Sequence, residues 1–254
     1  MAVAVDAAGT GKTGVAATSL TEGASSITVG AGANRALALL IQFGAAVSNV
    51  AAFWDEAGTN QAMKQIGNKA ESDNLGSTYI FGLIAPTSGA KLLKVTWTTS
   101  ASWTYGLLSF TGADQADVLG TFRNFISGAD ATRGGVPEVY PTTTGLNVNS
   151  PVGDFAIACA GSSAATFNAA TVGTNLYNLN TNVSGCGAYI TGGGASTNIR
   201  LSDSDSSAVP ACWAACDIAA VGAATRFIFA GYGIEDRSAD IARQMNKTIM
   251  VPYY

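Results

Sequence analysis

The sequence predicts an all-β protein built as a two-sheet antiparallel sandwich of the jelly-roll type, with one short C-terminal helix and extended terminal arms. Apolar segments about one strand long recur along the chain, rich in β-branched and aromatic residues and separated by Gly, Pro, Asn or Ser. A helical pattern occurs at only one place, near the C-terminus. Many short strands with long, turn-rich connections are typical of two sheets packed face to face, and a closed barrel is the alternative.

Residues 1–28 are expected to form an N-terminal arm followed by the first strands. Residues 2–14 are small and rich in Gly, a composition typical of an extended segment that can reach a neighbouring subunit. Weak strand candidates follow at residues 15–20 and 25–29.

Residues 29–221 are expected to form the β-sandwich core as one domain, which their length allows. The first strand candidates form a meander: residues 35–43, 49–54, 78–84, 92–97 and 105–110. Residues 114–150 mix aromatic residues with Gly and Pro, so we expect a long excursion with one short strand there. The second set of strand candidates is residues 154–160, 187–191, 198–201 and 211–220.

Residues 222–254 are expected to add a last strand at 226–232, a short helix and a tail. The helix is predicted at residues 238–245, where Ser238 is suited to cap the first turn. The last residues, 249–254, are apolar and aromatic, so we expect them to pack against the protein body or against a neighbouring subunit.

The low charge of the chain limits the possible partners. Only 12% of the residues are charged and the net charge is -4, which argues against nucleic-acid binding because neutralising phosphates requires clustered Lys and Arg. No apolar run approaches the roughly 18 residues of a membrane span, and residues 1–12 lack the features of a signal peptide. We therefore expect a cytosolic chain whose weakly charged surface favours a homo-oligomer or a larger assembly.

The four cysteines are expected to be buried free thiols, because each has small or apolar neighbours. If Cys212 and Cys216 lie on one strand, four residues at about 3.3 Å each separate them by roughly 13 Å, which is too far for a disulfide. A single bridge to Cys159 or Cys186 is the alternative.

Several short motifs follow one another in the order of a known pattern. They are NRAL at 34–37, Trp54-Asp55, YIFGLIAP at 79–86 with Gly89, LLSFTGADQ at 107–115, GDFAI at 153–157 and ACWAA at 211–215. This pattern resembles the β-sandwich modules of phage virion proteins and of some bacterial surface proteins, over residues 29–221. Such modules occur as head decorations, tail and fibre parts, and adhesins, so the resemblance implies a β-sandwich with a structural or binding role.

The expected function is that of a bacteriophage virion structural protein. The resemblance implies an accessory capsid decoration or cement subunit, or a tail or fibre component, located in the virion and assembled in the host cytoplasm. Its partners would be other virion subunits, such as major capsid or tail proteins, held by non-covalent clamping. Candidate assembly contacts lie in the arm and the tail: Thr10, Lys12, Met250, Tyr253 and Tyr254.

A carbohydrate-binding adhesin module that recognises host glycans is the alternative function. The apolar face of a sugar ring packs on an aromatic plane, and polar side chains beside that plane fix its orientation. The glycan-contact candidates are Trp54, Asp55 and Trp103, whereas Trp97 and Trp213 lie in apolar strands and are expected in the core.

No catalytic residue and no cofactor is expected. The chain has no histidine, which removes Ser-His-Asp and Cys-His systems and His-based zinc sites. Residues 9–13, GTGKT, resemble a phosphate loop, but Asp6 stands where the motif needs Gly and no helical pattern follows.

Carboxylates leave two further sites to consider. Asp203 and Asp205 match the first two ligand positions of a calcium loop, but the loop lacks the required Gly and the distal Glu. A polysaccharide-degrading enzyme would need a carboxylate pair across a cleft, and we expect the available carboxylates to lie on the surface and in turns instead. Those carboxylates are Asp55, Glu56, Asp73, Asp114, Asp117 and Glu138.

Overall fold

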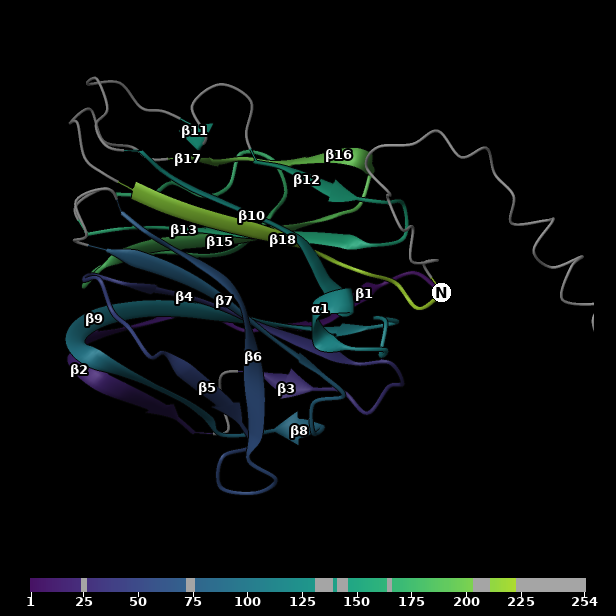
Figure 1. Cartoon of the computed structure of the whole chain (residues 1–254), viewed down its shortest axis with the longest axis horizontal. Coiled ribbons are helices and arrows are strands. Elements are labelled where there is room, and N and C mark those ends of the chain that lie inside the picture. Colours follow the sequence, from purple (N-terminus) through teal and green to yellow (C-terminus); the bar gives the residue numbers. More distant parts are fainter. Residues whose placement is uncertain are drawn as a thin grey trace, which may run out of the picture. The chain divides into compact units, whose positions relative to one another are not determined.

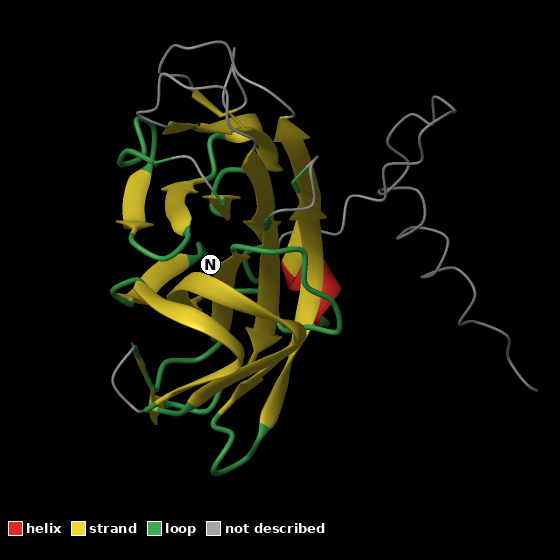
Figure 2. Ribbon diagram, turned by 90° about the vertical axis from the view of Figure 1, so that its left-hand side faces the viewer, coloured by secondary structure: helices red, strands yellow, loops and turns green. Residues whose placement is uncertain are grey.

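The computed structural model describes residues 1–23, 27–71, 76–130, 139–140, 146–163, 166–202 and 211–222. These residues belong to one compact unit, Met1–Ala223. Strands make up most of the described part of this unit, and its described helix, α1 (Val118–Thr121), has four residues (Figure 2). The prediction of an all-β protein is confirmed. The predicted strand at 226–232, helix at 238–245 and C-terminal tail lie outside the described residues.

Five strands of the first sheet pair in a closed ring. In order of pairing they are β4 (Ala36–Phe43), β7 (Ser77–Ile84), β6 (Gln61–Ala70), β5 (Ala51–Trp54) and β9 (Leu93–Thr111). β9 closes the ring because its residues 93–96 pair with β5 while its residues 103–110 pair with β4. Figure 1 shows β9 bending between these two segments. The prediction of a simple two-sheet sandwich is therefore wrong for this half of the protein, which is a small closed barrel.

The bend in β9 lies where the sequence predicted a break between two strands. Residues 98–102 are Thr, Ser and Ala and show no apolar alternation, but a single strand of 19 residues runs through them. Opposite β2, the register shifts between Thr96 and Ala101 of β9. Such an irregularity bends a strand without ending it.

The N-terminal residues form two strands that also pair with β9. β1 (Ala4–Ala8) pairs with its residues 108–111, and β2 (Lys12–Glu22) pairs with its residues 93–105. The predicted extended N-terminal arm is therefore wrong, because residues 4–8 and 12–14 belong to the barrel sheet.

The second sheet has five antiparallel strands. In order of pairing they are β10 (Phe122–Asp130), β18 (Ala211–Ile218), β13 (Phe155–Ser162), β15 (Ser184–Thr191) and β14 (Thr174–Asn180). Three short two-stranded sheets complete the described part: β12 (Leu146–Ser150) with β16 (Gly194–Ile199), β11 (Val139–Tyr140) with β17 (Leu201–Ser202), and β3 (Thr28–Val29) with β8 (Gly89–Ala90).

Buried apolar side chains form three clusters. Figure 1 shows the barrel strands, the second sheet and the β12–β16 pair one above the other. Alternate residues of β4 serve two of these clusters: Leu37 and Leu39 fill the barrel interior, while Ala38 and Leu40 pack against the second sheet. In the same way β13 has one face toward the barrel and the other toward β12 and β16. Both strands are buried along their whole length, which explains their continuous apolar sequences.

Several strands were not predicted. β6 and β14 have sequences that are largely polar, QAMKQIGNKA and TNLYNLN, and both are only partly buried. The expectation of one short strand in residues 114–150 is wrong, because β10, β11 and β12 all lie there. Pairing with other strands therefore determines that these segments are strands, since the apolar alternation in their own sequences is weak.

Candidate functional site

β2 forms an open edge of the barrel sheet. It pairs with β9 on one side, and no other strand of the described part of the chain pairs with it. Residues 13–21 carry no charge, and the side chain of Val15, at 71% exposure, is one of the most exposed large apolar groups. A long, uncharged edge strand offers backbone hydrogen-bonding groups to another strand.

The two ends of β2 lie close together. The Lys12 ammonium and the Glu22 carboxylate form an ion pair at 2.5 Å, although a straight strand of this length would span roughly 33 Å between those residues. β2 is therefore strongly curved, following the bend of β9. Its register against β9 shifts between Gly14 and Ala17 and again before Ser19, which leaves residues 12–14 and 19–22 regularly paired.

The assembly candidates named from the sequence are only partly described. Thr10 is exposed in the turn between β1 and β2, and Lys12 begins β2. Met250, Tyr253 and Tyr254 lie outside the described residues, as do the calcium candidates Asp203 and Asp205.

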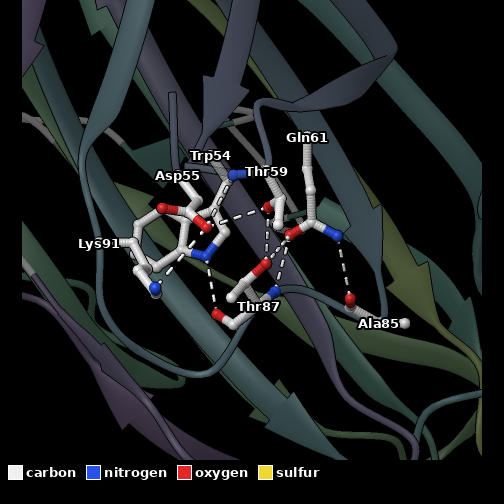
Figure 3. A network of polar contacts seen from close by, with 7 residues as sticks. All are labelled: Trp54, Asp55, Thr59, Gln61, Ala85, Thr87 and Lys91. Carbon is white, nitrogen blue, oxygen red and sulfur yellow. Dashed lines mark hydrogen bonds and ion pairs between the residues drawn. The ribbon is translucent and has the colours of Figure 1, made fainter. Parts of the chain in front are cut away.

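A polar network joins two loops at one end of the barrel (Figure 3). Asp55, directly after β5, has a positive φ of 54°, and its carboxylate accepts hydrogen bonds from the amide and the hydroxyl of Thr59 at 3.1 and 3.0 Å. The Lys91 ammonium lies 3.6 Å from the same carboxylate. The Thr59 amide, assisted by its hydroxyl and by Lys91, lowers the pKa of Asp55 although burial opposes the shift.

Gln61 extends this network to the loop after β7. Its side-chain oxygen accepts the amide and the hydroxyl of Thr87 at 2.7 and 2.8 Å, and its side-chain nitrogen donates to the Ala85 carbonyl at 3.2 Å. The Trp54 indole N–H donates to the Thr87 carbonyl at 3.0 Å (Figure 3). These bonds hold the two loops together, which is a structural role for the side chains involved.

The structure does not bring the three glycan-contact candidates together. Trp54 is 0% exposed inside the barrel, so its expected place on the surface is wrong. Asp55 is buried in the network just described. Trp103 lies ten residues along β9 from Leu93, the register partner of Trp54. It is half-buried and stacks on Tyr105 with 5.7 Å between ring centres. Only Trp103 among the three retains a partly accessible ring.

Three of the sequence motifs meet in space. Arg35 of NRAL donates to the carbonyls of Pro86, at 3.1 Å, and Gly32, at 2.8 Å. The amide side chain of Gln115 donates to the Arg35 carbonyl at 3.0 Å and to the Ala113 carbonyl at 3.1 Å. These residues follow or precede β4, β7 and β9, so the motifs tie together the ends of neighbouring strands.

Sequence reasoning missed a buried ion cluster in the second sheet. The Arg123 guanidinium donates to Asp154 at 2.6 Å and to Asp217 at 2.8 Å, and both carboxylates are almost fully buried. Asp154 also accepts the Ala220 amide at 2.8 Å. Burial raises the pKa of Asp217 to about 6, although the hydrogen bond and the charge of Arg123 oppose the shift. An acidic residue inside the apolar stretch 211–221 was the available signal.

The four cysteines are free and buried, which confirms the prediction and makes the alternative of a disulfide wrong. Burial raises the pKa of Cys212 to about 12 and raises those of Cys159 and Cys216 as well. Thiols in this state are not nucleophilic at neutral pH.

Comparison with family models, curated proteins and solved structures gave no match. Within the described ranges, no group of three or more acidic or cysteine side chains is arranged to hold a metal ion. No helix in the same ranges has the length and apolar character needed to cross a membrane.

Proposed function

We propose that this chain is a structural subunit of a bacteriophage virion. It acts as an accessory capsid decoration or cement subunit, or as a tail or fibre component, and it holds neighbouring subunits by non-covalent contacts. The observation that carries the proposal is the open β2 edge, because strand addition at such an edge binds a partner through backbone hydrogen bonds and needs no reactive group.

The rigidity of the body supports this role. Side chains at the strand ends, such as Arg35, Gln61 and Gln115, bond to backbone carbonyls and amides of neighbouring loops. Such side-chain-to-backbone bonds order the loops before a partner binds, which lowers the entropic cost of holding neighbouring subunits together.

The identity of the partners rests on the motif resemblance and on charge. The motifs point to other virion subunits, such as major capsid or tail proteins, and to further copies of this chain. The net charge of -4 supports contacts with protein rather than with the packaged nucleic acid. The resulting location is the virion, after assembly in the host cytoplasm, and the role is not enzymatic.

Gold-labelled antibodies against the purified chain test this proposal on purified phage particles. Electron microscopy should show label on the particle, and the labelled region separates a head from a tail or fibre position. Antibodies pre-adsorbed with the purified chain are the control. Recovery of the chain only as a free monomer, with particles left unlabelled, would contradict the proposal.

Glycan binding is the second candidate function, and Trp103 is the observation that favours it. Its half-buried ring stacks on Tyr105 with an interplanar angle of 30°, which leaves an ordered aromatic surface for a sugar. Under this alternative, sugar titration should change the tryptophan fluorescence of the wild-type protein, and Trp103→Phe should abolish the change. A silent titration across a glycan panel would rule the alternative out.

A further inference from the structure

We propose that β2 pairs with β2 of a second copy of this chain, antiparallel and with Ala17 opposite Ala17. The inference rests on the proposed function, since it names the partner of the same open edge. It predicts a two-fold symmetric dimer in which the barrel sheets of both copies join.

The charges at the ends of β2 select the antiparallel direction. Lys12 and Glu22 stand at opposite ends of the strand, so the proposed pairing places Lys12 of each copy opposite Glu22 of the other. Parallel pairing would place like charges side by side, which is unfavourable. Each copy already holds its own pair at 2.5 Å, so the dimer would contain four charges of alternating sign.

The regular parts of β2 select the register. Residues 12–14 and 19–22 pair continuously with β9, and the irregular residues lie between them. With Ala17 on the two-fold axis, residues 12–14 of one copy face residues 20–22 of the other. The regular segments therefore meet each other, and the irregular centres face each other at the axis. Any other register would place a bulged segment opposite a regular one and weaken the ladder.

The residues between the charged ends suit pairing. The proposed register sets Thr13 opposite Thr21 and Val15 opposite Ser19, and Thr and Val favour strands. Residues 13–21 contain no Lys, Pro or carboxylate, residues that edge strands commonly carry and that prevent pairing with another chain.

The curvature of β2 is compatible with this symmetry. A two-fold axis perpendicular to the sheet at Ala17 turns the strand end for end but preserves the direction in which it bends. The two strands therefore curve together and remain side by side. The contact uses the same edge on both copies, so it closes on itself and gives a dimer rather than a filament.

A charge-swap experiment tests the pairing. In full-length protein, Lys12→Glu alone and Glu22→Lys alone should each weaken dimerisation about tenfold or more, because both contacts become repulsive. An equimolar mixture of the two variants should form a heterodimer, since every cross-strand contact is then attractive. Analytical ultracentrifugation measures both effects. Mixing cannot repair the ion pair within either chain, so recovery identifies the contact between copies.

Cysteine cross-linking supplies a second measurement. Ala17→Cys should form a disulfide between copies on mild oxidation, because only the residue on the axis meets its own equivalent. Ser19→Cys is the matched control and should not cross-link, since it faces Val15 of the other copy. The native cysteines are buried and do not compete.

Two results would overturn the inference: a wild-type chain that stays monomeric at high concentration, or a mixture of charge variants that shows no recovery. If the chain nevertheless labels purified particles, self-pairing is wrong while the virion role stands. If the chain dimerises as proposed but particles carry no label, the pairing stands and the virion role is wrong.

Discussion

At the scale of single residues, Asp217 is a carboxylate whose burial is electrostatically costly. Its side chain is fully buried, and its carboxylate is held by Arg123, which also bonds Asp154. Burying a carboxylate is unfavourable unless a counter-charge and hydrogen bonds replace its water. The raised pKa of Asp217, about 6, indicates that burial outweighs the help from Arg123.

This residue predicts an unusual dependence of stability on pH. Because the pKa of Asp217 is about 6 in the folded protein and 3.8 without perturbation, the folded state binds more protons than the unfolded state between these values. The free energy of unfolding should therefore rise as the pH falls from 7 to about 4, by at most about 3 kcal/mol. Urea unfolding across this range measures the slope.

Asp217→Asn should flatten the slope, while Asp117→Asn, at an exposed helix cap, should keep it. Further acidification below about pH 4 should reverse the trend, because the pKa of Asp55 is lowered and its contribution is lost on protonation. A wild-type slope that persists in Asp217→Asn would show that another group controls the effect.

At the scale of elements, β1 is held in place by the side chain of Asp6 as well as by its ladder with β9. It has only five residues, with a register shift between Val5 and Ala7. The Asp6 carboxylate accepts the Gly30 amide at 2.7 Å and the Ser109 hydroxyl at 2.8 Å. A short terminal strand frays readily, and these bonds attach it a second time to β9 and also to the segment that follows β3.

Asp6→Ala should loosen β1 locally. Loss of its two hydrogen bonds should lower the protection of the amides of residues 4–8, which corresponds to about 1–2 kcal/mol for opening this strand. Hydrogen exchange measured by mass spectrometry reports the change. Asp117→Ala removes a hydrogen bond to the Gly120 amide in α1 and is the matched control. Equal loss of protection in β4 and β1 would show that Asp6 supports the whole barrel instead.

At the scale of the whole described body, the barrel and the second sheet share one apolar layer. Leu40 and Phe110 of the barrel sheet pack with Ile157 and Ile218 of the second sheet, and all four are fully buried. Neither half can bury its facing side chains alone. We therefore expect the two halves to unfold together, as a single cooperative transition.

Two tryptophans can report on the two halves separately. Trp54 lies in the barrel interior, and Trp213 packs on the far face of the second sheet. Variants that keep one of them, with the other tryptophans changed to Phe, should show the same urea midpoint by fluorescence and by far-ultraviolet circular dichroism. A lower midpoint for either probe would mean that one half unfolds first.

Much of the fold could be predicted from local sequence. The apolar segments at 36–43, 77–84, 155–162 and 211–218 are strands with nearly the predicted bounds. Their side chains are buried on at least one face whatever the strand order, so the local pattern is sufficient. Polar strands such as β6 and β14 could not be found this way, because contacts with distant strands hold them in place.

The candidate sites depended far more on long-range pairing. Sequence reasoning placed Trp54 on the surface, but the closed ring of strands encloses it. Arg123, Asp154 and Asp217 are far apart in the chain and meet only because β10, β13 and β18 are neighbours. Residues 2–14 looked like a free arm because their small side chains carry little apolar signal, whereas backbone pairing with β9 includes them in the sheet.

The sequence by itself determined the class of this protein, its strong strands, its buried thiols and its weakly charged character. Each of these follows from composition or from the alternation of neighbouring residues. Tertiary structure alone decided the closure of the barrel through β9, the burial of Trp54 and the open edge of β2. Those features depend on which strands become neighbours, and backbone hydrogen bonds between distant segments are formed alike by almost any residue type.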